Sequence, residues 1–405
     1  MSDPSTRPAP AWQPLYFLAA LGAGGLAVSF FMYLMWMTPH AGQPIPSFTT
    51  LTTAFIEGTL AMKALIVVAV AGIAVFTALH VRLVIWNVVR LRAWHPTEAA
   101  ITMKRTNSGS AIMAVPLTYA MVINVGFIVG AVFVPGLWER AEWLFPFALA
   151  GFAAIGVYAL RLFAGFMTQM IVEGGFDCAK NNSLSQMLSV FAFAMVGVGF
   201  SAATAMSHNP LVSVIGFSGA AFFISAAVLF GLMFLFMGFR SMLENKANPE
   251  TVPTLWIIIP FITVIGIALY RMNMALDHNF GVEWLAGEKF AFLITLFAVQ
   301  LLFGVLGYSV MKRTGYFETY VSGPGKSPGS FALICPGVAL FVFANFVINP
   351  GLVGLGVMEQ FSLAWYIAYV PLVAVQLLTI RTFFRLTGKL ITSDRPAPAA
   401  MVPAE

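Results

Sequence analysis

Residues 211–239 read LVSVIGFSGAAFFISAAVLFGLMFLFMGF and contain no charged side chain. A stretch of this length and composition predicts an α-helix that crosses a lipid bilayer, because about 20 apolar residues span the hydrocarbon core. A strand of an outer-membrane barrel would instead be a shorter segment of alternating hydrophobicity, and this stretch does not alternate. The stretch therefore indicates an all-α membrane protein.

The composition of the whole chain agrees with this stretch. Of 405 residues, 60% are hydrophobic and only 9% are charged, whereas soluble domains contain roughly 25% charged residues. The chain has too few charged residues to form a water-exposed surface. We therefore expect its surface to contact the lipid bilayer, which is its expected partner. The formal net charge of +5 does not predict a nucleic-acid partner, since basic residues between membrane helices serve to orient those helices.

Apolar runs separated by Pro, Gly or charged residues predict ten transmembrane helices. They are expected near 15–37, 60–88, 110–135, 142–172, 184–207, 211–243, 252–273, 288–311, 329–349 and 360–390. The segment at 49–58 is expected to be either a short interfacial helix or a loop. One domain at 15–390 is therefore predicted, with a cytoplasmic tail at 1–14 and a disordered cytoplasmic tail at 391–405.

The distribution of Lys and Arg predicts how the chain crosses the membrane. Most of these residues fall in the two tails and in the connections that follow the even-numbered helices, and only Arg140, Arg271 and Lys289 fall on the opposite side. Cytoplasmic loops retain positive charge. Both termini are therefore predicted to face the cytoplasm of a bacterial inner membrane.

Several residues mark the odd-numbered helices as different. Pro116, Pro260 and Pro336 lie inside the third, seventh and ninth predicted helices, and Gly197 lies inside the fifth. Proline frees a backbone carbonyl, which a spanning helix tolerates beside protein or a water-filled cavity. Either the odd-numbered helices form an inner ring around a pore, or Gly and Pro simply allow close helix packing. Asn124, in the third helix, is explained equally well by a pore or by helix-to-helix hydrogen bonding.

Few ionisable side chains lie inside the predicted helices, where a charge at mid-bilayer costs roughly 2.5–3.5 kcal/mol. His80, Arg82 and Arg161 lie toward the cytoplasmic ends of their helices, so we expect them to anchor the helices at the interface. Lys63 and Arg271 lie near the opposite face and are interpreted as solvated interfacial charges rather than as attractants for anions. A pore with so little embedded charge would favour anions through helix dipoles.

The sequence predicts no enzyme, no cofactor and no metal site. It has no G-x-x-x-x-G-K-[ST] loop, no H-E-x-x-H motif and no G-x-S-x-G elbow. Among its histidines only His80 lies well inside a predicted helix, so the facing pairs that hold a membrane haem are not expected. Cys178 and Cys335 lie too far apart in sequence for a zinc pattern.

Short motifs near the C-terminus resemble a known family. Ile380-Arg381-Thr382-Phe383 and Gly388-Lys389-Leu390 are similar to the end of the last helix in the tellurite-resistance and dicarboxylate transporter (TDT) family, which includes plant slow-type anion channels. The resemblance implies ten helices in five hairpins around a quasi-five-fold pore lined by the odd-numbered helices. It also implies a homotrimer that passes a small anion. Residues 327–337, SPGSFALICPG, resemble a bacterial branch known as the TsoY family, some members of which are described as selenoproteins.

Cys335 is the sharpest departure from the TDT pattern. The resemblance implies a phenylalanine that plugs the pore beside the proline of the ninth helix, and aligning Pro336 places Cys335 at that position. The alternative is that Cys335 is a small apolar residue packed beside a proline, with an inert thiol. Two functions stay open: a channel or transporter for small oxyanions or sulphur-containing anions, and a membrane redox or thiol-exchange component that uses Cys335.

Overall fold

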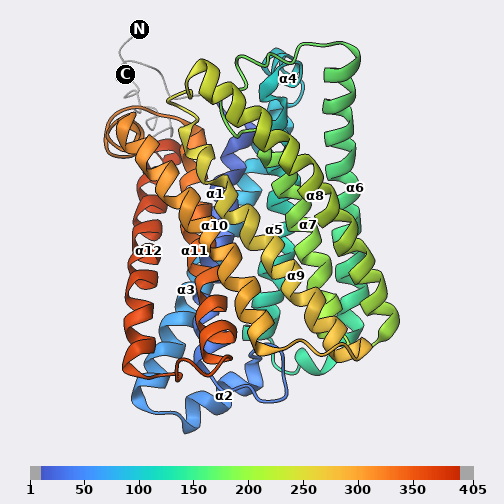
Figure 1. The fold of residues 1–405 in the computed structure, drawn as a ribbon, viewed down its shortest axis with the longest axis vertical. Helices are drawn as coiled ribbons and strands as arrows, with labels where there is room; N and C mark the ends of the chain where they lie inside the picture. The colour runs from blue at the N-terminus through green and yellow to red at the C-terminus, as the bar shows by residue number, and fades with distance from the viewer. Residues whose placement is uncertain (1–10, 393–405) are drawn as a thin grey trace, which may run out of the picture.

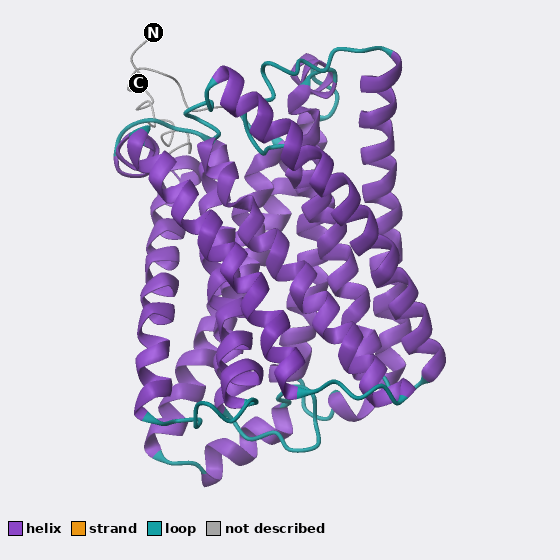
Figure 2. Ribbon diagram, in the orientation of Figure 1, coloured by secondary structure: helices purple, strands orange, loops and turns teal. Residues whose placement is uncertain are grey.

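The computed structural model describes residues 11–392, so most of the two predicted tails, at 1–10 and 393–405, lies outside the described residues. Within this range the chain is built from helices without strands, and ten of the helical segments are long and apolar enough to cross a membrane (Figure 2). The prediction of an all-α polytopic membrane protein is confirmed.

The spans correspond closely to the predicted helices. Their α-helical parts are α1 (Phe17–Met37), α3 (Leu60–Trp94), α5 (Ala114–Phe133), α6 (Ala141–Val172), α7 (Met187–Met206), α8 (Pro210–Asn245), α9 (Ile258–Phe280), α10 (Ala286–Arg313), α11 (Ile334–Phe346) and α12 (Leu363–Thr387). Two short helices, α2 (Phe48–Glu57) and α4 (Glu98–Lys104), lie at opposite ends of the bundle (Figure 1). The segment predicted as helix or loop is therefore helix α2.

Burial alternates along the chain. The central windows of the spans that contain α1, α5, α7, α9 and α11 are 61–100% buried, whereas those of the other five spans are 17–33% buried. On the outer helix α10, for example, Leu302 and Val305 are exposed. The odd-numbered spans thus form the interior of the bundle, as the predicted inner ring requires.

The five inner helices close into a ring. Each packs against the next, in the order α1, α5, α7, α9 and α11, and α11 packs back against α1. Where the ring closes, a Cβ atom on Gly22 of α1 would lie only 2.8 Å from Cγ2 of Ile334 on α11. A larger residue at position 22 would push the two helices apart, so the glycine permits closure.

The prolines are placed differently from what the sequence suggested. Pro116, Pro260 and Pro336 are each the third residue of an α-helix that follows a 3-10 turn, at Asn107–Met113, Val252–Ile257 and Pro328–Leu333. Proline is well tolerated in the first helical turn, so these residues begin their α-helices and do not kink them midway.

Proline also fails to distinguish inner from outer helices. Pro146 and Pro371 lie inside the outer helices α6 and α12.

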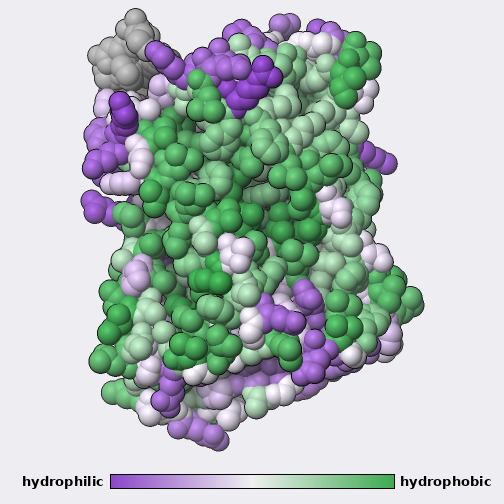
Figure 3. Space-filling view, viewed as in Figure 1, coloured by the Kyte–Doolittle hydropathy of each residue, from purple (hydrophilic) through white to green (hydrophobic). Residues whose placement is uncertain are grey.

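The outer surface is suited to lipid. Figure 3 shows a hydrophobic band across the middle of the molecule, with hydrophilic residues gathered at the two ends. Arg82 and Arg161 are exposed. His80 is not, because it is fully buried and its Nδ1 lies 2.7 Å from the carbonyl oxygen of Ala20 on α1. The predicted interfacial anchoring is therefore wrong for His80, which instead joins α3 to α1.

Candidate functional site

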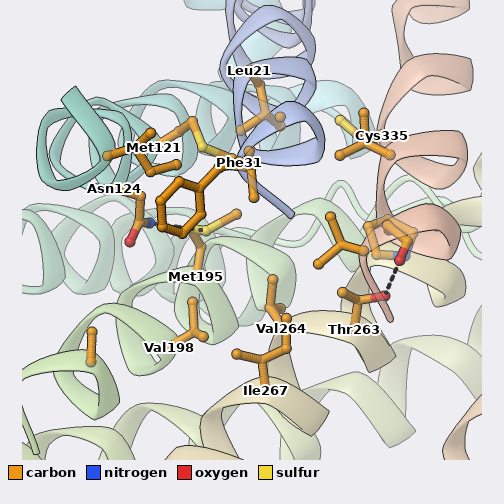
Figure 4. Close-up of a pocket in the computed structure, with 18 of the residues that line it drawn as sticks. Leu21, Phe31, Met121, Asn124, Met195, Val198, Thr263, Val264, Ile267 and Cys335 are labelled. Atoms are coloured by element: carbon orange, nitrogen blue, oxygen red, sulfur yellow. Dashed lines mark hydrogen bonds between the residues drawn. The ribbon is translucent and has the colours of Figure 1, made fainter. Parts of the chain in front are cut away.

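The ring of inner helices surrounds a central cavity, whose empty volume, including space open to solvent, is about 1110 Å³. Every inner helix contributes to its wall, which is mostly aliphatic, aromatic and thioether side chains. Figure 4 shows Phe31, Met121, Met195, Val264 and Cys335 arranged around this cavity from α1, α5, α7, α9 and α11. The cavity therefore lies inside the membrane-spanning part of the molecule.

A second cavity, which we call the vestibule, lies at the N-terminal ends of the same five helices. Its empty volume is about 1140 Å³. Hydroxyl groups line it from four of the five spans or the loops before them: Ser108, Ser110, Ser185, Thr251, Thr254 and Ser327. The inner helices all point their N-termini toward the vestibule, and the partial positive charge of a helix N-terminus favours anions there. Glu250 is the carboxylate in its wall.

Three residues line both cavities: Phe191, Pro260 and Cys335. On α7, for example, Leu188 lines the vestibule and Met195 lines the central cavity, with Phe191 between them. The same succession occurs on α9 and α11. We call these three residues the boundary layer, because they lie where the vestibule meets the central cavity.

Arg271 supplies positive charge to the central cavity. Its side chain is half-buried and lines the cavity wall, and its Nη1 donates to the carbonyl oxygen of Val198 over 3.2 Å. Because Val198 lies near the middle of α7, the guanidinium is held well below the end of the bundle. Within residues 11–392 the ion pairs are Lys180 with Asp177 and Arg240 with Glu244, so Arg271 has no carboxylate partner there.

The structure thus places the Arg271 side chain in the cavity wall, whereas the sequence favoured a solvated interfacial charge. Side chains of an α-helix lean toward its N-terminus, so a residue late in α9 can place its guanidinium deeper than its position in the sequence suggests.

Asn124 lies beside α7 on the side of α5. Its Nδ2 donates to the carbonyl oxygen of Ala120 over 3.1 Å and lies 3.6 Å from Sδ of Met195. Met195 and Val198 are one helical turn apart, so Asn124 and Arg271 flank α7 at neighbouring depths. The two side chains form a polar layer in a wall that is otherwise mostly apolar.

Three of the candidate residues do not line either cavity. Pro116 and Pro336 are buried, and neither belongs to the walls described above. A Cβ atom on Gly197 would lie 2.9 Å from Cδ1 of Ile224, which places Gly197 against the outer helix α8. Of the six candidates, Cys335, Pro260 and Asn124 line the central cavity.

Phe191 and Arg271 are the residues that sequence reasoning did not select. Phe191 is one of 38 phenylalanines, and nothing local distinguishes it from the others. Arg271 did carry a signal, because it is the one Lys or Arg in the span Val252–Phe280.

These features define the class of the molecule, which is an all-α, polytopic membrane protein with an internal cavity. No family model matches the chain, and no curated protein matches it. Within residues 11–392, no three His, Cys, Asp or Glu side chains lie close enough together to hold a metal ion.

Proposed function

We propose that the protein passes small anions across a membrane through the ring of inner helices. The observation that carries this proposal is the guanidinium of Arg271, which faces the central cavity without a carboxylate partner among residues 11–392. A charge inside the bilayer is costly, so its presence in a cavity points to a mobile partner of opposite sign.

The helix N-termini at the vestibule also favour an anion. Five helix N-termini surround the vestibule and stabilise an anion that has lost part of its hydration shell, whereas the carboxylate of Glu250 in the same wall opposes one. The anion would move between the vestibule and the central cavity through the boundary layer, which includes Phe191 and Cys335.

The resemblance to the TDT family supports this function. It adds the expectations of a quasi-five-fold pore, a homotrimer and an inner-membrane location, together with small oxyanions or sulphur-containing anions as substrates. These expectations are part of the proposal, which covers both a channel and a coupled transporter.

A second function follows from the position of Cys335. A thiol that lines both cavities is reachable from either of them, so the protein could exchange electrons or a persulfide group with a partner through this cysteine.

Anion flux into proteoliposomes distinguishes the two functions. If a Cys335→Ser protein still conducts anions, the result supports the pore. If the wild type conducts none and the substitution removes a thiol-dependent turnover, the redox function stands and the pore does not.

Introduced cysteines should report which surfaces meet water. In a background that carries Cys178→Ser and Cys335→Ser, Val338→Cys on the cavity wall should react with a small water-soluble thiol reagent. Val370→Cys on the outer face of α12, where the native side chain is 67% exposed, should not react, because lipid excludes the reagent. Equal labelling of the two positions would remove the distinction between a hydrated interior and a lipid-facing exterior.

The distribution of Lys and Arg makes a prediction about orientation. A reporter that is active only in the cytoplasm, fused after Glu405, should be active, because the basic connections hold that side of the bundle inside. A fusion at Gly136, on the opposite side, is the matched control and should be inactive. Activity in the reverse pattern would invert the proposed topology.

A further inference from the structure

We infer that the anion which the central cavity selects is a monoanion with an apolar body, such as an alkyl carboxylate or an alkyl sulfonate. The inference deepens the proposed function and rests on it. It follows from three properties of the cavity wall: its charge, its supply of free hydrogen-bond donors and its apolar area.

The charge of the wall suits one negative group. Arg271 is the one Lys, Arg or His side chain in the wall, and no Asp or Glu lines it. A second negative charge on the same ligand would therefore meet apolar side chains, where an unpaired charge is strongly disfavoured. The wall thus favours a monoanion over a dianion.

Free donors are few. The Thr263 hydroxyl lies 3.0 Å from the carbonyl oxygen of Ile259 and 3.2 Å from that of Ala339, and it accepts a hydrogen bond from Gln300 Nε2. The Nδ2 of Asn124 already donates to the carbonyl oxygen of Ala120 and to Sδ of Met195, so Arg271 is the side chain left to bind the anionic group. One guanidinium does not replace the hydration shell of a compact, strongly hydrated anion, but its remaining N–H donors do suffice for one carboxylate or sulfonate.

The rest of the wall suits a hydrocarbon chain. Four methionines line it, Met32, Met121, Met195 and Met206, together with phenylalanines and branched aliphatic residues. Methionine side chains are flexible and adapt to ligands of varied shape. An apolar body of variable length therefore has a surface to pack against on either side of the guanidinium.

Binding of a matched ligand series to the detergent-solubilised full chain tests the inference. Calorimetry with acetate, butyrate and hexanoate should show affinity rising by about fourfold for each added methylene group. Adipate, which has the chain length of hexanoate and a second carboxylate, should bind more weakly than hexanoate. Hexanamide, which lacks the charge, should also bind more weakly.

Two variants locate the site. Arg271→Gln should remove the preference for hexanoate over hexanamide while the dependence on chain length persists. Val264→Ser, on the apolar wall, should reduce the dependence on chain length. Arg240→Gln is the control for Arg271→Gln, because Arg240 is an exposed residue on α8, and it should change neither quantity.

The outcomes also separate this inference from the proposed function. If affinity does not depend on chain length, or adipate binds as tightly as hexanoate, the inferred ligand class is wrong even where chloride or nitrate still crosses proteoliposomes. If hexanoate binds as expected and no anion crosses, the ligand class stands and the transport function fails.

Discussion

Arg271→Gln is expected to abolish anion selectivity. An anion about 4 Å from a unit positive charge gains about 4 kcal/mol at an effective dielectric constant of about 20, which corresponds to roughly a thousandfold in occupancy. Without the guanidinium, no basic side chain lines the central cavity. In planar bilayers with a KCl gradient, the reversal potential should move from near the chloride equilibrium potential toward zero, and anion flux should fall.

Substitutions at the same position give the matched controls. Arg271→Lys retains the charge and should retain most of the selectivity, whereas Arg271→Glu should shift the preference toward cations. Arg240→Gln removes an exposed charge from α8 and should leave the reversal potential unchanged. A reversal potential of Arg271→Gln equal to that of the wild type would contradict the role of Arg271 and with it the proposed function.

The thermal stability of the protein gives an independent test of the role of Arg271. A guanidinium in a membrane interior costs roughly 2.5–3.5 kcal/mol even on the lenient insertion scale. If Arg271 serves an anion, Arg271→Gln should leave the thermal unfolding temperature in detergent equal or higher. A large loss of stability would instead identify the hydrogen bond to Val198 as structural.

Phe191→Ala is expected to raise anion flux. Phe191 belongs to the boundary layer, where a hydrophobic constriction can close the path by excluding water. If removal of the ring lowers the barrier by about 1.4 kcal/mol, flux in proteoliposomes should rise by about tenfold. Phe193→Ala is the matched control. Phe193 lies two residues along α7, faces Phe163 on α6 and lines neither cavity, so its loss should not raise flux.

A larger side chain at position 335 should lower anion flux, just as a smaller one at position 191 should raise it. Cys335→Phe places a ring in the boundary layer and should reduce flux, while Cys335→Ala should leave flux equal or higher. Oxidation of the thiol adds bulk and polarity, so an oxidant should slow transport in the wild type and not in Cys335→Ala. If Cys335→Phe conducts like the wild type and the oxidant affects both proteins equally, Cys335 is a packing residue.

The amino-acid sequence by itself determined the membrane-spanning architecture. An α-helix must satisfy its backbone within its own segment and must match the bilayer thickness, so the length and polarity of a run such as 211–239 decide that it spans. Both properties are local, and every one of the ten predicted spans is present. Helix ends were less certain, because 3-10 turns such as Pro328–Leu333 extend a span without changing its composition.

Only the tertiary structure decided which side chains face the cavities. Helix α7 is apolar on every side and wholly buried, so no pattern along it distinguishes the face of Phe191 from that of Gly197, six residues away. In an amphipathic helix the polar residues identify the side that faces water. A helix that is buried on all sides has no polar face, so its sequence does not show which side lines a cavity. The depth of Arg271 likewise depended on the carbonyl oxygen of Val198 from another helix, a contact between residues far apart in the chain.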